Sequence, residues 1–521
     1  MLTNNKYKTL ALLIVPFLLA VVDFFFLKAA FPLHSGSPGY DQDPAYAYLF
    51  NGLLILEGYP PYHIDHPGTP LQLLFALTIF IRWGLTRVFG DSTLDIVDSV
   101  INNPESYLHD MAVLLLVLNL VALTFFGRRI AESTGKIYLG MFCQLSLLSF
   151  TIMAPKATYP APEALLIFCS LILLGLLSPR IFALQYPQNI GSNVSSKMVG
   201  ATFALGMAVK ITFVPMALLL VLLQKGKERR VGIVTSIFVF LLLTCPALPN
   251  ADRFFAWVTG LLSNSGIHGG GGAGFINLAK VPNNLYNLFV WFPLFLPALT
   301  LAIYAVLTTS IRYPTTSIRG PLVLLSVVLV QTGLVLKHPG AHYMIAVLPM
   351  ALVLLAWVVL TAYLEQLVVK LLLVTVIGIG LLHSVSLTIV GVKKLADQRA
   401  QMSIALSEIN RELALNPDAL IICSYRCALP QYALTMAFIY APQLISEKTT
   451  RQLKNFYDYD IFIGEFVAVG KAALPFSSLP TLLSEYDTAM LITPSLYPPL
   501  NTIILHPIYL SPVQSLYRFT K

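Results

Sequence analysis

Long apolar segments recur along this chain of 521 residues, and short polar stretches separate them. A helix needs about 20 apolar residues to cross a bilayer, with a range of about 17 to 25. Segments of this kind with few or no charged residues occur at 10–30, 111–127, 137–154, 161–178, 198–223, 231–249, 285–310, 320–336, 343–363 and 370–391. If one of them forms two short helices, as argued below, the pattern predicts a polytopic α-helical membrane protein with about 11 transmembrane helices.

The apolar pattern changes character in two places. Residues 70–90 are apolar but include Arg82 and Arg87, so we expect an amphipathic helix at the membrane interface, within an interfacial region of residues 70–108. From about residue 393 charged residues return, and short β-type runs begin at Leu420, Tyr459 and Ala489. We therefore predict a transmembrane domain of residues 1–392 and a small α/β domain of residues 393–521 on the extracytoplasmic side of the membrane, with a helix over 428–440.

Composition supports a membrane protein and argues against a soluble enzyme. Hydrophobic residues make up 56% of the chain, charged residues 11%, and the mean hydropathy is +0.75, whereas soluble domains carry roughly 25% charged residues. The net charge of +8 does not indicate nucleic-acid binding, because the basic residues punctuate the apolar segments instead of clustering. We expect an integral protein of a bacterial plasma membrane and no nucleic-acid partner.

Basic residues predict the topology, because cytoplasmic loops are enriched in Lys and Arg. With the N-terminus inside, the basic positions expected inside are Arg128, Arg129, Arg180, Lys197, Lys225 to Arg230, Arg312 and Arg319. Segment 198–223 has basic flanks on both sides, so it must cross an even number of times. We predict two short helices broken around Lys210 and Pro215, a break that membranes tolerate only where it lines a cavity or packs on protein.

The first predicted outer loop, residues 31–70, is unusually rich in ionisable groups, namely Asp41, Asp43, Glu57, His63, Asp65 and His66. Ionisable clusters at a membrane surface are functional candidates. A carboxylate here can act as a general base, and we favour Asp43 over Asp41. Alternatively, a divalent metal is held by Asp43 and His66 with Glu163. The structural reading is that Asp41 and Asp43 form turns beside prolines and that the histidines are incidental.

Later outer segments contribute further candidates. Glu163 heads an apolar span, where it can also serve as a first-turn carboxylate, and Lys210 lies deep in one, where a lysine needs a partner. His268 lies in a glycine-rich stretch that is as well explained as a linker. The last segment carries Lys337, His338, His342 and Tyr343, which can bind phosphate or anchor the interface. The early outer segments thus supply carboxylates and the later ones supply cationic groups. Glycosyl transfer from a lipid phosphate requires both, a base for the acceptor and a cation for the departing phosphate.

These residues resemble the motifs of the GT-C class of membrane glycosyltransferases, which includes protein O-mannosyltransferases and the lipid A aminoarabinose transferase. The resemblance covers about residues 10–365 and rests on short sequences: Asp41-Gln-Asp-Pro-Ala-Tyr, His66-Pro-Gly-Thr-Pro-Leu, Arg128-Arg129, Pro162-Glu163, Lys210 and Lys337-His-Pro-Gly-Ala-His-Tyr. It implies polyprenyl-phosphate sugar donors, a base in the first outer loop and a second acid at Glu163. The chain departs from the class at Asp65-His66-Pro67, where relatives often carry a Glu-Lys-Pro-Pro or Glu-Tyr-Pro sequence, and it lacks Trp-Trp-Asp.

The sequence thus predicts an inverting glycosyltransferase that moves a sugar from a polyprenyl-phosphate carrier to a glycan, lipid or protein acceptor on the outer face. In this hypothesis Lys210, His66, Lys337, His338, His342 and Tyr343 bind the donor phosphate, whereas His63, Asp65 and His268 bind substrate. The alternatives are a secondary transporter or flippase, or a non-catalytic assembly subunit. The sugar, the acceptor, the need for a metal and a Cys423–Cys427 disulfide stay open.

Overall fold

The computed structural model describes residues 10–519 in two compact units. Its description leaves out 31–41, 65–66, 91–92, 184–194, 266–271, 313–315, 362–366, 425–439, 445–458, 463–464, 469–472, 475–487, 494–504 and 511–514. Unit 1 comprises Met1–Phe24, His63–Leu73 and Ala112–Ile389, and unit 2 comprises Phe25–Tyr62, Leu74–Met111 and Val390–Lys521. Four of the described helices, α2, α4, α6 and α19, contain residues of both units.

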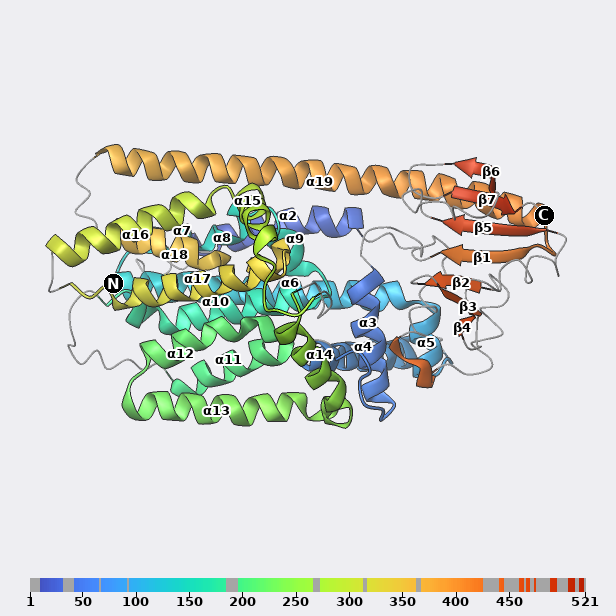
Figure 1. The fold of residues 1–521 in the computed structure, drawn as a ribbon, viewed down its shortest axis with the longest axis horizontal. Coiled ribbons are helices and arrows are strands. Elements are labelled where there is room, and N and C mark those ends of the chain that lie inside the picture. Colours follow the sequence, from blue (N-terminus) through green and yellow to red (C-terminus); the bar gives the residue numbers. More distant parts are fainter. Residues whose placement is uncertain are drawn as a thin grey trace. The chain divides into compact units, whose positions relative to one another are not determined.

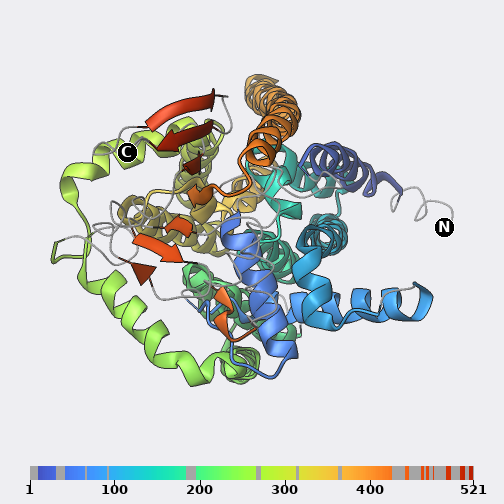
Figure 2. The same cartoon turned by 90° about the vertical axis from the view of Figure 1, so that its right-hand side faces the viewer.

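Unit 1 is a helical bundle (Figure 1), and Figure 2 shows many of its helices end on. Its helices, three of them shared with unit 2, are α2 (Ile14–Ala30), α6 (Pro104–Thr134), α7 (Ile137–Gln144), α8 (Ser146–Ser149), α9 (Met153–Thr158), α10 (Pro162–Ile181), α11 (Ser196–Val209), η1 (Ile211–Met216), α12 (Ala217–Leu223), α13 (Gly226–Thr244), η2 (Cys245–Asn250), α14 (Ala251–Ser263), η4 (Leu278–Lys280), α15 (Val281–Trp291), α16 (Phe295–Arg312), α17 (Arg319–Lys337), η5 (Ala341–Met344), α18 (Leu348–Thr361) and α19 (Leu367–Leu415). The core is built on α10 and α18, which are buried along most of their lengths.

Fewer helices span a membrane by length and apolarity than the sequence pattern predicted. Among the described residues five qualify, or six if the bent pair of α15 and α16 counts as one span. The predicted spans 137–154 and 198–223 are divided into shorter helices. The predicted span 285–310 is not one continuous helix, because the chain turns by 97° between α15 and α16. Pro293 explains the turn, since the residue before a proline is driven out of helical geometry, and Phe292 has φ −134° and ψ 67°.

The break predicted at Lys210 is confirmed. Helix α11 ends at Val209, Lys210 is extended at φ −159° and ψ 125°, and η1 and α12 follow. Both ends of this helix hairpin, residues 196–223, lie against Gly232 of α13. A Cβ built on Gly232 would approach the Gln224 Oε1 to 2.6 Å and the Ser196 carbonyl oxygen to 3.5 Å. The chain therefore goes out and returns, which places Lys210 at the tip.

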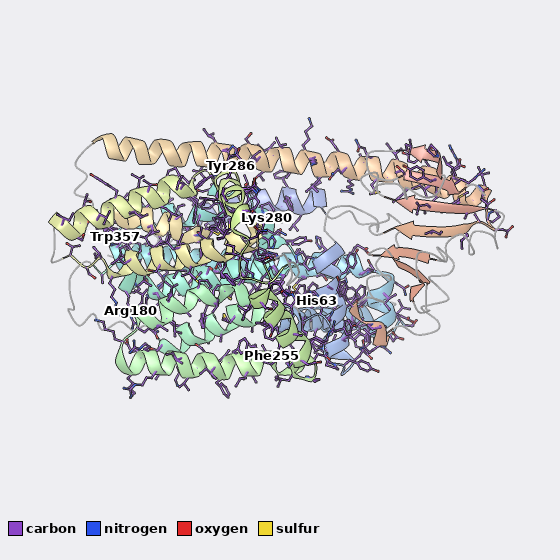
Figure 3. The ribbon with its side chains drawn as sticks, in the orientation of Figure 1. His63, Arg180, Phe255, Lys280, Tyr286 and Trp357 are labelled. Carbon is purple, nitrogen blue, oxygen red and sulfur yellow. The ribbon has the colours of Figure 1, made fainter. Side chains whose placement is uncertain are left out.

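Several of the basic residues predicted to share one side meet at one end of unit 1, here called the basic end. Arg180, at the end of α10, donates to the Leu223 carbonyl at 3.3 Å and to the Glu228 Oε2 at 2.8 Å. Arg319, at the start of α17, donates to the Leu222 carbonyl. The Ser178 hydroxyl donates to the Arg129 carbonyl at 3.1 Å, which brings the end of α6 to the same place. Figure 3 labels Arg180.

Unit 2 contains α3 (Gln42–Leu56), α5 (Ile96–Asn102), most of α4 (Thr69–Phe89) and a seven-stranded sheet. The strands are β1 (Leu420–Ser424), β2 (Tyr459–Phe462), β3 (Glu465–Ala468), β4 (Ala473–Leu474), β5 (Ala489–Thr493), β6 (Leu505–Leu510) and β7 (Ser515–Phe519), in the order β4-β3-β2-β1-β5-β7-β6. The three β-type runs predicted from the sequence form the parallel centre, β2, β1 and β5.

One helix extends further than the sequence predicted, and two other predictions about this part of the chain stay untested. Helix α19 continues to Leu415, so the return of charge near residue 393 changes the surface of a helix and does not end it. Helix α4 forms over the predicted residues, but it also satisfies the length and apolarity of a span, so its interfacial position stays a prediction. The helix predicted over 428–440 lies almost wholly outside the described residues, as does Cys427.

Candidate functional site

A buried ion pair marks the centre of the candidate site. The Lys210 Nζ lies 2.8 Å from the Glu163 Oε1, and the two side chains are only 4% and 5% exposed. Pro162 opens α10 and places Glu163 in its first turn, where a carboxylate faces the positive end of the helix dipole. Lys210 arrives from the tip of the helix hairpin. Helix α10 runs from Glu163 to Arg180 over about 25 Å, so the pair lies at the end of unit 1 opposite the basic end.

Stability alone does not account for this pair. Taking two charges out of water costs several kcal/mol for each ion, and well-packed apolar residues often stabilise a core better than a buried ion pair does. Charges retained at such depth in a membrane protein usually serve binding or transport. The pair is therefore the first place to look for chemistry.

Aromatic rings cover the lysine. The Lys210 Nζ lies 4.7 Å from the centre of the Tyr343 ring, a cation–π distance. The Tyr343 ring packs in turn on His342, with ring centres 4.0 Å apart, and on His338 at 4.7 Å. Gly340 permits this packing, because a Cβ there would come within 3.0 Å of atoms of both the His342 and the Tyr343 rings. The 338–343 segment is thus folded tightly onto Lys210.

Electrostatics make this group of side chains a cationic site with neutral donors. Burial, and then the Lys210 charge, lower the pKa of His342, so its imidazole is neutral at pH 7. Burial and the Glu163 charge raise the pKa of Tyr343, so it remains a phenol. Lys156, which lies 4.0 Å from the centre of the Tyr159 ring, adds a second positive charge to the field at His342. We call Lys156, Glu163, Lys210, His342 and Tyr343 the Lys210 cluster; its two ammonium groups and one carboxylate leave one positive charge in excess.

Uncharged polar residues hold the cluster in place, and sequence reasoning did not identify them. The buried Gln331 donates to the Tyr343 carbonyl at 2.7 Å, and Ser170 of α10 donates to the Ala346 carbonyl at 2.7 Å. Asn119 of α6 donates to the carbonyls of Ala157 and Ala164, which flank Glu163, at 2.9 and 3.1 Å. The sequence does mark Gln331 and Asn119, because a Gln or Asn inside an apolar span must find a hydrogen-bond partner.

Lys337 makes a different set of contacts from the one expected of a phosphate ligand. Its ammonium group donates to three backbone carbonyls, those of Leu261, Asn264 and Phe275. An ammonium group has three donors, so all of them are used. Lys337 thereby fastens the end of α17 to the residues that flank the glycine-rich stretch. We therefore do not keep it among the proposed phosphate ligands.

Several predicted site residues are not placed by the structure. Asp41, Asp65, His66 and His268 lie outside the described residues. Asp43 lies in the first turn of α3, but its side chain is not described. The His63 carbonyl accepts a hydrogen bond of 2.7 Å from Gln72. Within the part of the chain that is described, no group of three or more metal-binding side chains occurs.

Because Gln331 donates to the backbone of Tyr343 itself, its role can be tested. We expect Gln331→Leu to leave the Tyr343 carbonyl without its buried donor, which costs about 1–3 kcal/mol. If the chain transfers sugar from a donor lipid, as its sequence predicts, the misplaced ring should lower kcat more than it raises the KM for that lipid, whereas Gln331→Glu should disrupt both folding and kcat. A steady-state comparison beside thermal unfolding checks this. Loss of stability with an unchanged kcat in the folded fraction would assign Gln331 a purely structural role.

Comparison with known proteins identifies the fold. The chain is similar to ArnT from Cupriavidus metallidurans bound to undecaprenyl phosphate, with a TM-score of 0.51 and 12% sequence identity over 96% of this chain and 97% of that one. The apo structure of the same protein matches with a TM-score of 0.49, at 12% identity and the same coverage. No family model matches the chain, and no curated protein sequence matches it. The GT-C resemblance drawn from the sequence is thus confirmed at the level of the fold.

Proposed function

We propose that this protein is an inverting membrane glycosyltransferase that transfers a sugar from a polyprenyl-phosphate donor to an acceptor outside the cytoplasm. The observation that carries the proposal is the Lys210 cluster: a buried lysine with a neutral histidine and a phenol beside it, on a fold shared with ArnT. A phosphodiester carries one negative charge, which matches the single positive charge in excess. In this orientation the basic end faces the cytoplasm.

The reaction breaks the bond between the anomeric carbon and the phosphate oxygen and forms a bond from the acceptor oxygen to that carbon. The electron pair of the broken bond stays on the phosphate, whose charge grows from one to two negative units. Lys210 stabilises this growing charge, and a site screened from water strengthens that effect. His342 and Tyr343 are neutral N–H and O–H donors of the kind that an oxyanion requires.

On the acceptor side a base must take up the hydroxyl proton. We assign this role to Asp43, with Asp41 as the alternative, because a carboxylate at the outer face can accept a proton from a bound hydroxyl. Attack from the face opposite the leaving phosphate inverts the anomeric centre. Glu163 is bound to Lys210 and sets the position of the ammonium group between the carboxylate and the incoming phosphate.

The metal-bound alternative fits this arrangement poorly. Glu163 was one of its three expected ligands, yet an ammonium group lies 2.8 Å from its Oε1. A divalent cation at that carboxylate would meet the repulsion of Lys210 at close range. We therefore assign the neutralisation of the leaving phosphate to Lys210, and we derive no step through a metal.

The direct test is turnover with a defined donor. Purified protein is incubated with a panel of polyprenyl-phosphate sugars, and release of polyprenyl phosphate and the configuration of the product are measured. We expect one donor class to be consumed with inversion, and Lys210→Met to lose that activity. Lys136→Met, which removes an exposed lysine far from the cluster, is the matched control and should remain active. Lipid translocation in proteoliposomes without release of polyprenyl phosphate from any donor would instead indicate a flippase.

A further inference from the structure

Helix α13 begins with four cations that have no carboxylate partner among the described residues. Lys225, Lys227, Arg229 and Arg230 are all exposed, and the one acid among them, Glu228, is bound to Arg180. The helix has no side-chain cap at its N-terminus. Cations near a helix N-terminus face the positive end of the helix dipole, which is unfavourable. The first turn does contain Glu228, but its carboxylate is bound to Arg180, so the four exposed cations favour an anion from outside the chain.

Two of these cations continue into an apolar stripe on one face of the helix. At 3.6 residues per turn, Lys227, Arg230, Val234, Ile237 and Leu241 fall within an arc of about 80°. The three apolar side chains are 66%, 57% and 54% exposed, and the exposed Phe238 and Leu242 continue the apolar surface beyond one edge of this arc. We call these five residues the α13 stripe. Figure 1 shows α13 beside α11 at the edge of unit 1.

The opposite face of α13 is the one that packs on the bundle. Gly232 approaches Gly200 of α11 so closely that a Cβ on Gly200 would lie 2.2 Å from the Gly232 carbonyl oxygen. The Ser236 hydroxyl donates to the Gly200 carbonyl at 3.1 Å. This tight packing fixes the rotation of α13 about its axis. The α13 stripe therefore points away from the protein and cannot turn inward to bury itself.

The dimensions of the stripe match those of a membrane lipid. From Arg230 to Leu241 the helix rises about 16 Å, close to half of the roughly 30 Å hydrocarbon core. Two cations at one end and apolar side chains along a single leaflet are complementary to an anionic headgroup with an acyl chain. A second copy of this chain fits the stripe less well. In a parallel dimer Lys227 and Arg230 of one copy would lie beside the same cations of the other copy and repel them.

We propose that the α13 stripe binds one anionic phospholipid, with its phosphate between Lys227 and Arg230 and an acyl chain along Val234, Ile237 and Leu241. The lipid belongs to the leaflet at the basic end. Its phosphate neutralises Lys227 and Arg230 beside the uncapped N-terminus of α13, where an anion is favoured by the helix dipole. Lipid binding there also braces α13 against α11, the helix that carries Lys210 at its end. The site is independent of the proposed transferase activity.

Adjacent arginines provide a matched test. Arg230 lies on the α13 stripe, whereas Arg229 points about 120° away from its middle. Thermal unfolding of the full-length protein in detergent is followed while phosphatidylglycerol or phosphatidylcholine is added. We expect phosphatidylglycerol alone to raise Tm, and Arg230→Gln to weaken its apparent affinity about fivefold, the effect of roughly 1 kcal/mol per cation at a lipid surface. Arg229→Gln should leave that affinity unchanged.

Native mass spectrometry then counts the bound lipids. The proposal expects one retained phosphatidylglycerol per protein, lost in Arg230→Gln and kept in Arg229→Gln. Equal effects of the two variants would mean diffuse charge attraction and would overturn the site. Equal stabilisation by both lipids would overturn its selectivity for an anionic headgroup. Dimers without bound lipid, dissociated by Ile237→Glu, would show that a second copy occupies the stripe and would also overturn it.

Discussion

Lys210→Met is expected to lower turnover by about 10²- to 10³-fold, the usual loss when a single group that stabilises a developing oxyanion is removed. The loss arises because Lys210, almost fully buried and held at 2.8 Å from the Glu163 Oε1, is the cation that we propose stabilises the leaving phosphate. Turnover of a labelled polyprenyl-phosphate donor measures it directly. The variant also leaves the Glu163 carboxylate buried without its partner, which destabilises a protein by about 3–5 kcal/mol.

A double variant separates the two effects. In Glu163→Gln/Lys210→Met both charges are gone, so we expect most of the lost stability to return, because neither side chain is then an uncompensated ion. Turnover should stay low, since the charge that we propose faces the phosphate is still missing. Thermal unfolding and donor turnover are compared across the two single variants and the double variant. If activity returned together with stability, Lys210 would serve folding only and the phosphate would bind elsewhere.

The sequence predicted those features of the fold that depend on local composition. The break of the hairpin followed from basic residues on both sides of 198–223, because a single crossing would have exposed one flank on the wrong side. The central strands β1, β2 and β5 followed from short β-branched runs. The bend between α15 and α16 was missed although Pro293 marked it. Helix α19 continues past the predicted domain boundary near residue 393, since residues 392–415 contain neither Gly nor Pro and Pro417 follows them.

The candidate site was predictable only as a set of separate charges. Glu163 and Lys210 stood out because each is an ion in an apolar segment, yet they are 47 residues apart, and nothing local indicates that they pair. The contacts of Lys337 could not be predicted at all, because its partners are backbone carbonyls, which every residue has. Uncharged residues such as Gln331 were not predicted, because a single amide in an apolar span does not indicate which backbone carbonyl it will bind.

The first outer loop carries the other large expected effect, a loss of about 10²–10⁴-fold in turnover for Asp43→Asn. The substitution keeps the size of the side chain while it removes the carboxylate that we propose takes up the acceptor proton. The first turn of α3 is well anchored for such a role, because Tyr46, one turn after Asp43, donates to the Glu105 Oε1 at 2.6 Å. Fixed backbone geometry of this kind keeps a base within reach of its proton.

The measurement is the rate of sugar transfer at saturating donor, together with the KM for the donor lipid. A lost base should lower kcat and leave that KM nearly unchanged, since Asp43 acts on the acceptor side. Glu57→Gln is the matched control: it neutralises an exposed carboxylate at the other end of α3 and should keep normal turnover. Asp41→Asn decides between the two candidate bases. If Asp43→Asn stayed active and Asp41→Asn did not, the proton would go to Asp41; if both stayed active, neither aspartate would be the base.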